Sequence, residues 1–188
     1  MEKYTFKSIM SRTIIVHTVT YFVMGLLAMI YMNYSELFVD PGIKGLMREV
    51  DSPWVAVGPM LQVVRGLLFG LVFYLLREIV FARKVGWLIL WVLLVCVGIL
   101  SPFGAAPSSI EGVLYTNLPL WFHIIGLPEV VIQALLLAGL THLWVNHPDW
   151  KSLDWAFGIL FILVLLFSAL GLLSALGFLV VPEGYSFF

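Results

Sequence analysis

Two ionisable side chains stand inside stretches that are otherwise apolar. Arg65 lies in "QVVRGLLFG" and Glu129 lies in "GLPEVVIQ". A charge within hydrocarbon costs about 2.5–3.5 kcal/mol or more, so each group needs a partner or a function. A guanidinium and a carboxylate can neutralise each other as a buried ion pair, or they can bind a ligand or an ion together. We therefore take Arg65 and Glu129 as the centre of the candidate site.

Both charges are expected at the same depth in a membrane. Arg65 follows Pro53 by about 12 residues and Glu129 follows Leu118 by about 11, along two segments that run in the same direction. At about 1.5 Å of rise per residue, each lies near the middle of its helix. Gln62 and Gln133 fall on the same helix faces as the two charges. The sequence thus predicts a polar binding centre at Arg65, Glu129, Gln62 and Gln133.

Prolines interrupt the two segments that carry these charges. Pro59 and Pro128 lack the amide hydrogen of a helix interior, which frees the carbonyls of Val55 and Ile124. A freed carbonyl at membrane depth must face protein, water or a substrate. Paired interrupted helices mark the binding sites of secondary transporters. The alternative is two structural kinks, with an ion pair that only fixes helix packing.

Composition places the chain in a membrane. Of its 188 residues 62% are hydrophobic and 11% are charged, whereas soluble domains carry about 25% charged residues. The expected fold class is all-α: an integral membrane bundle of five transmembrane helices forming a single domain over residues 1–188. The apolar segments that reach spanning length are about 13–33, 53–81, 85–100, 118–145 and 155–181. Ser52 and Asn117 are expected to cap the second and fourth.

Basic residues in the connections predict the orientation. Seven Lys and Arg residues, Arg12 among them, fall on the side of the N-terminus and two on the other. The positive-inside rule then places the N-terminus in the cytoplasm and, with five spans, the C-terminus outside. The first segment lacks a small-residue cleavage site, so we expect it to be retained. The net charge of −1 gives no basic field for a nucleic acid, so the expected partner is the lipid bilayer.

The histidines and the single cysteine suggest weaker possibilities. His17 and His142 are expected at matched depth on two helices, as axial ligands of a b-type haem would be. No second pair of histidines and no arginine cluster for propionates accompany them. No metal site is predicted, because His123, Glu111 and Asn117 lack ligand spacing. Cys96 is expected to be a small core residue.

Small residues mark two helix faces and one connection. Gly66 and Gly70 form a small-xxx-small pair that lets a neighbouring backbone approach. Ser168, Gly171, Ser174 and Ala175 form a similar stripe on the last segment. The outward loop "SPFGAAPSSIEGVLYTN" is nearly uncharged and is expected to fold back over the bundle above Glu129. His123, Glu111 and Asn117 would then line the outer approach to the polar centre. No catalytic residue is predicted, since Ser108 and Ser109 have no base at helical spacing.

One part of the chain resembles a known group. The segments "SSIEGVLYTNLPLWFHIIGLPEVVIQ" and "QVVRGLLFG" are similar to those of a group of small multi-span bacterial membrane proteins. The resemblance implies a bacterial inner (plasma) membrane and a motif that contains Glu111, His123 and Glu129. It implies no reaction.

Three classes of function follow from these residues. The first is a non-enzymatic membrane protein that binds or passes a small solute or ion at the Arg65 and Glu129 centre. The second is an accessory or scaffold subunit, in a homo-oligomer or a membrane complex, whose buried pair only fixes helix register. The third is a b-type haem carrier with His17 and His142 as ligands. An intramembrane enzyme acting on lipid would use the same polar centre as the first.

Overall fold

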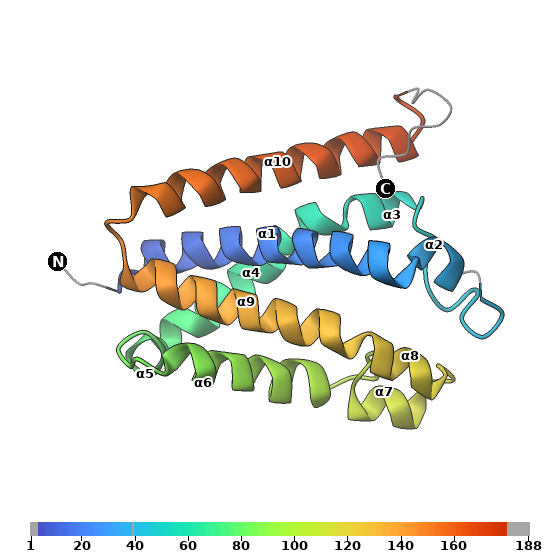
Figure 1. Ribbon diagram of the computed structural model, residues 1–188, viewed down its shortest axis with the longest axis horizontal. Coiled ribbons are helices and arrows are strands. Elements are labelled where there is room, and N and C mark those ends of the chain that lie inside the picture. Colours follow the sequence, from blue (N-terminus) through green and yellow to red (C-terminus); the bar gives the residue numbers. More distant parts are fainter. Residues whose placement is uncertain (1–3, 39, 180–188) are drawn as a thin grey trace.

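The computed structural model describes residues 4–38 and 40–179, and among these residues it contains helices and no strand. The helices are α1 (Phe6–Met32), α2 (Tyr34–Leu37), α3 (Pro53–Ala56), α4 (Gly58–Leu75), α5 (Arg77–Val80), α6 (Gly86–Leu93), the π-helix η1 (Leu94–Leu100), α7 (Ile110–Tyr115), α8 (Leu120–Ile125), α9 (Leu127–Asn146) and α10 (Lys151–Ala175). The long helices lie side by side in alternating directions (Figure 1). The all-α prediction is confirmed.

Four helices are long and apolar enough to cross a membrane. They are Phe6–Met32, Gly58–Leu75, Lys151–Ala175, and α8 with α9 taken together as Leu120–Asn146. The predicted third span corresponds to the shorter apolar helix Gly86–Leu100, formed by α6 and η1. A π-helix has a wider turn than an α-helix, and it is often found at functional sites. The predicted end of the last span, residues 180–181, lies outside the described residues.

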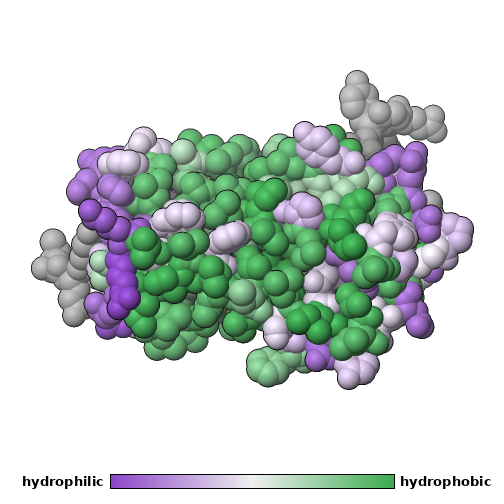
Figure 2. Space-filling view, turned by 60° about the horizontal axis from the view of Figure 1, so that its bottom comes forward, coloured by the Kyte–Doolittle hydropathy of each residue, from purple (hydrophilic) through white to green (hydrophobic). Residues whose placement is uncertain are grey.

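The exterior between the two ends of the bundle is apolar. Figure 2 shows a broad hydrophobic band flanked by hydrophilic residues at both ends. Large apolar side chains such as Leu75, Trp155 and Ile162 are exposed on it, as expected for a surface that faces lipid. Cys96 is exposed on η1, so the prediction of a core cysteine is wrong.

Helix α1 is the centre of the bundle, packing on α4, α9 and α10, while α6 packs on α9. The closest approach is to α4, at the two glycines of the predicted small-xxx-small pair. A β-carbon built on Gly66 would lie 2.8 Å from the Ile14 Cα atom, and one on Gly70 would lie 2.6 Å from Met10 Sδ. The predicted close backbone approach is therefore confirmed, and α1 is the partner.

Both proline-containing helices are interrupted where the sequence predicts. The first breaks at Val57 between α3 and α4, and the second breaks at Gly126 between α8 and α9. In each case proline is at the start of the second piece, where its missing donor costs least. At the first break the Ser168 hydroxyl donates to the Ala56 carbonyl over 2.6 Å. The small-residue stripe of α10 thus begins with a residue that supports this interruption.

Helix caps differ in detail from the prediction. Ser52 occupies the N-cap position of α3, but its side chain makes no capping hydrogen bond. Asn117 does not cap a helix: α8 begins at Leu120, with Pro119 at its N-cap. Pro119 fixes an extended backbone before the first helical turn, which moves the helix start past Asn117.

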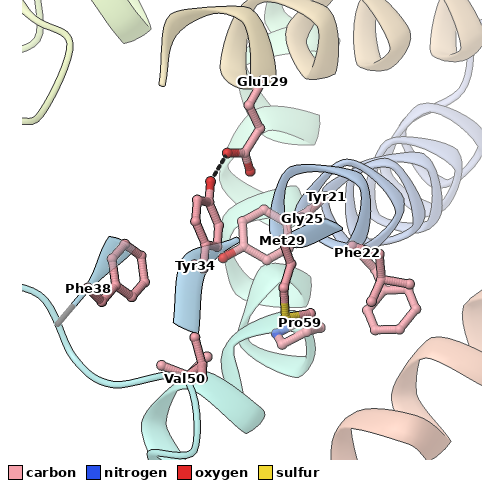
Figure 3. A pocket seen from close by; sticks show the side chains of 11 residues that line it. Tyr21, Phe22, Gly25, Met29, Tyr34, Phe38, Val50, Pro59 and Glu129 are labelled. Carbon is pink, nitrogen blue, oxygen red and sulfur yellow. Dashed lines mark hydrogen bonds between the residues drawn. The ribbon is translucent and has the colours of Figure 1, made fainter. Parts of the chain in front are cut away.

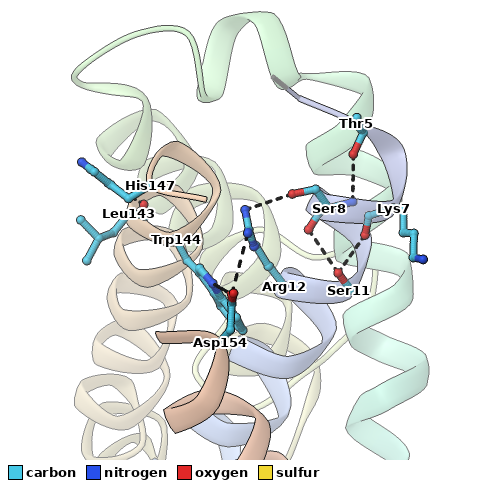
Figure 4. A network of polar contacts seen from close by, with 9 residues as sticks. All are labelled: Thr5, Lys7, Ser8, Ser11, Arg12, Leu143, Trp144, His147 and Asp154. Atoms are coloured by element: carbon cyan, nitrogen blue, oxygen red, sulfur yellow. Dashed lines mark hydrogen bonds and ion pairs between the residues drawn. The ribbon is translucent and has the colours of Figure 1, made fainter. Parts of the chain in front are cut away.

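Helix α1 begins at Phe6, well before the predicted start at residue 13, because Thr5 caps it and accepts from the Ser8 amide. Arg12 is therefore a helical residue and not a loop charge. Its guanidinium lies 3.9 Å from the Asp154 carboxylate of α10 and stacks over the Trp144 ring (Figure 4). The Trp144 indole N–H donates to the same carboxylate over 2.7 Å. This cluster ties α1, α9 and α10 together at one end of the bundle.

Candidate functional site

A cavity of about 220 Å³ brings together most of the predicted polar centre. It lies between α1, α4, α9 and η1, and the Arg65, Glu129 and Gln133 side chains line it. Two α1 residues that the sequence did not single out for this site, His17 and Tyr21, form its back wall. The remaining lining is apolar or small: Phe69, Leu94, Gly98, Ile99, Ala106, Pro107, Val130, Ala134 and Leu137.

Arg65 and Glu129 line this cavity without forming an ion pair. Among the described residues, the ion pairs within 4.0 Å join Arg12 to Asp154 and Arg77 to Glu78. Arg65 makes no hydrogen bond to a described residue, and its guanidinium lies 5.4 Å from the Phe69 ring centroid. The predicted pairing is therefore not what the structure contains. Matched depth does not fix the direction of a side chain: Gly66 faces α1, and the preceding residue points about 100° around the helix from it.

Glu129 has a different partner, the tyrosine that follows α1. The Tyr34 hydroxyl on α2 donates to a Glu129 carboxylate oxygen (Figure 3). Burial, and then this hydrogen bond, raise the pKa of Tyr34, so its hydroxyl remains protonated and donates at neutral pH. Asn33, in the left-handed conformation with φ 45°, ends α1, and Tyr34 begins α2 directly after it.

Glu129 lies where three hollows meet. Besides the cavity with Arg65, it lines a second hollow of about 230 Å³ with Tyr21 and Pro59 (Figure 3). A third, of about 350 Å³, is walled by α2, α8 and the loop at Pro107. Tyr34 borders both the second and the third. The carboxylate and its tyrosine donor therefore separate the Arg65 cavity from the hollows at the α2 end of the bundle.

Gln62 contributes to the centre indirectly, through His17. The His17 Nε2 atom lies 3.1 Å from the Gln62 Oε1 atom, which can only accept, so Nε2 carries the proton. The opposite ring nitrogen, Nδ1, is then a bare acceptor, and it is buried with no hydrogen-bond partner. His17 is 1% exposed and lines the Arg65 cavity. Because this acceptor is enclosed by protein, the group that is open to the cavity and unpaired is the Arg65 cation.

The loop after η1 covers the cavity as the sequence predicts. Ala106 and Pro107 line the same cavity as Arg65 and Glu129. His123 holds this loop in place: its Nδ1 atom accepts from the Ser108 amide over 2.9 Å, and its Nε2 atom lies 3.5 Å from Thr116 Oγ1. His123 is buried. It therefore acts in fixing the loop and not as part of an open approach.

The other two residues of the predicted outer approach lie elsewhere. Glu111 lines a separate hollow with Cys96 and Phe103, on the far side of the loop. Asn117 is exposed in the connection between α7 and α8. The loop folds so that Ala106 and Pro107, and not Glu111, face the polar centre.

The two histidines proposed as haem ligands have separate surroundings. His17 contacts Gln62 and Phe69. His142 Nε2 lies 3.1 Å from the Arg83 carbonyl oxygen, and its ring stacks on Phe81. Each Nε2 atom is thus already occupied by a protein acceptor. Among the described residues, no group of three or more His, Cys, Asp and Glu side chains is arranged to hold a metal ion.

Tyr34 and Tyr21 are the site residues that sequence reasoning missed. Tyr21 lies four residues after His17, on the same helix face, and both line the Arg65 cavity. For Tyr34 the available signal is Asn33, a residue that tolerates the left-handed conformation, directly after a long apolar segment.

Replacing Tyr34 with Phe is expected to lower stability by about 1 kcal/mol, because Glu129 loses its donor in a half-buried setting. Since the pKa of Tyr34 is raised on folding, the stabilisation is complete below about pH 10 and declines as pH rises toward the folded value. Thermal unfolding in detergent at neutral and alkaline pH measures both effects. Tyr31→Phe, at an exposed position of α1, is the control and should change neither. Equal unfolding temperatures for Tyr34→Phe and wild type would show that the hydrogen bond contributes nothing.

Comparisons with protein-family models, with curated proteins and with solved structures found no match.

Proposed function

We propose that this protein binds a small solute or ion at the Arg65 cavity and holds or passes it within the membrane. The observation that carries the proposal is the unpaired guanidinium. Arg65 lies in the middle of an apolar helix, lines a cavity, and has no hydrogen bond or ion pair with a described residue. A charge in that position costs free energy unless a ligand or water provides its hydrogen-bond partners.

The arrangement favours binding over a purely structural role for the two charges. A scaffold pair would place Arg65 against Glu129 in dense packing. Instead a cavity lies between them, and Glu129 is held by Tyr34. The scaffold alternative still has one supporting feature, the buried small-residue face of α10 at Ser168 and Gly171, which packs on α3 and α4.

The proposal includes five spans, an N-terminus in the cytoplasm and a location in the bacterial inner membrane. Alternating directions of α1, α4, α6, α9 and α10 support the span count (Figure 1). The α6 and η1 pair is shorter than an average hydrocarbon core, so it would cross where the bilayer is locally thin. The excess of Lys and Arg at the end that holds α5 supports the orientation.

Arg65→Met tests the proposal with Arg77→Met as the matched control, because Arg77 pairs with Glu78 at a helix end, outside the cavity. Both variants and wild type are purified from their own membranes and analysed by native mass spectrometry. We expect wild type and Arg77→Met to retain a bound species that Arg65→Met loses at least tenfold. Freed of bound species, Arg65→Met should unfold at the wild-type temperature or above, since it leaves no buried charge without a partner; with the species present, wild type should be stabilised and Arg65→Met should not. A marked fall in the unfolding temperature of the ligand-free variant, or retention of the same species by all three proteins, would overturn the proposal.

A further inference from the structure

The Arg65 cavity opens sideways, between two helices that do not pack on each other. Arg65 and Phe69 of α4 line one side of it, and Leu94, Gly98 and Ile99 of η1 line the other. Helix α4 packs on α1 and α10, whereas α6 and η1 pack on α9 and on each other. Figure 1 shows α4 and α6 close together near α5 and apart toward the other end. The cavity therefore has a lateral opening in the apolar band.

Arg65 stands at this opening and not behind it. It is exposed, while His17 behind it is buried. In a bilayer an exposed guanidinium at mid-helix faces hydrocarbon, where nothing but a ligand or water can satisfy its five N–H donors. A guanidinium binds phosphate or carboxylate oxygens through two parallel hydrogen bonds, so an anionic oxygen group is the best complement to it.

The other lining residues indicate which further parts of the ligand the cavity can accept. The walls at the opening are apolar, which suits acyl chains, and the polar acceptors lie deeper. The deeper acceptors are the carboxylate oxygens of Glu129, one of which is used by Tyr34. The other suits a hydroxyl group of a head group. A cavity of about 220 Å³ accommodates a head group but not the acyl chains of a lipid as well. The chains must therefore extend through the opening.

From this geometry we infer that the ligand is an anionic membrane lipid. It enters between α4 and η1 and places its phosphate or carboxylate on Arg65, with its acyl chains left in the bilayer. The inference rests on the proposed function of the same cavity and adds the substrate class and the route of entry.

Gly98 allows the route to be tested apart from the charge. A β-carbon at Gly98 would meet no atom within 4 Å, so a large side chain there fits the fold and fills the mouth of the cavity. Gly158 on α10 is equally free of neighbours and does not line this cavity. The matched pair is therefore Gly98→Phe and Gly158→Phe.

The experiment is native mass spectrometry of the full chain in detergent, titrated with phosphatidylglycerol or phosphatidylcholine. Phosphatidylglycerol offers both a phosphate for Arg65 and hydroxyls for the deeper acceptors. We expect it to bind wild type at least tenfold more tightly than phosphatidylcholine. Arg65→Met and Gly98→Phe should lose this preference, while Arg77→Met and Gly158→Phe should keep it. Glycerol 3-phosphate, which has the anion but no chains, should not compete.

The possible negative results distinguish a failure of the lipid inference from a failure of the proposed function. Competition by glycerol 3-phosphate at the concentration of the lipid would show a site for a soluble anion, which sinks the lipid inference and leaves the proposed function intact. The same holds if phosphatidylglycerol has no preference but another species is lost with Arg65. Absence of any bound species that depends on Arg65 would remove both.

Discussion

Gly66→Leu is expected to be strongly destabilising at the interface of α1 and α4, with a loss of about 3 kcal/mol or more in stability. The reason is that the atoms a side chain at this position would meet belong to the backbone of α1. A β-carbon at Gly66 would lie 2.8 Å from Ile14 Cα and 3.4 Å from the Ile14 carbonyl oxygen. Neither atom can rotate away, so α1 and α4 must separate. Overpacking commonly costs about 1–3 kcal/mol where side chains can adjust, and here the helices themselves must move.

The neighbouring glycine provides an internal ranking. At Gly70 the nearest atom is Met10 Sδ, the flexible end of a side chain, and the Met10 Cα atom lies 3.3 Å away. Gly70→Ala is therefore expected to be milder than Gly66→Ala, although both glycines are buried. Gly158→Leu, on α10 with open space around it, is the control for the residue change itself. Unfolding temperatures in detergent give the order, and a Gly66→Ala variant as stable as Gly158→Leu would contradict the tight α1 and α4 contact.

The features that could be predicted from sequence are those with local causes. A proline has no amide hydrogen wherever it lies, so the breaks near Pro59 and Pro128 follow from two residues. A glycine has no side chain wherever it lies, so close approach at Gly66 follows from the pattern alone. Apolar length similarly predicts a helix that can span a bilayer.

The partners of the buried charges could not be predicted in the same way. Depth along a helix follows from counting residues, but the direction in which Arg65 points depends on which face of α4 packs on α1. The bond from Tyr34 to Glu129 joins residues 95 positions apart, across the break that Asn33 makes between α1 and α2. The conformation of such a loop, and the rotation of a helix about its own axis, depend on the packing of the whole bundle. The sequence therefore predicts that Arg65, Glu129 and Gln133 lie near one another, and they line one cavity, but it does not predict their contacts.

The second large effect on stability is expected in the cluster of Arg12, Trp144 and Asp154 at the opposite end of the bundle. Its contacts also depend on the packing of the whole bundle. Asp154→Ala removes the acceptor of the Trp144 indole, which is 3% exposed, and the counter-charge of Arg12. A buried donor left without a partner costs about 1–3 kcal/mol. The contribution of the ion pair is smaller, because the Asp154 side chain is 46% exposed and the two charges are 3.9 Å apart. We expect a total loss of about 2–3 kcal/mol.

Asp154→Asn separates the two contributions, because an amide oxygen still accepts from Trp144 while the charge is gone. It should lose less than about 1 kcal/mol. Thermal unfolding of both variants measures the difference, and tryptophan fluorescence in the folded state should change in Asp154→Ala more than in Asp154→Asn. Equal losses would assign the cluster to charge pairing and not to the indole hydrogen bond. The same measurement distinguishes Asp154 from Arg65. Removing Asp154 leaves buried groups without partners and lowers the free energy of unfolding, whereas removing the Arg65 charge leaves no buried group without a partner. The Asp154 charge therefore stabilises the fold, while the Arg65 charge is available to bind a ligand.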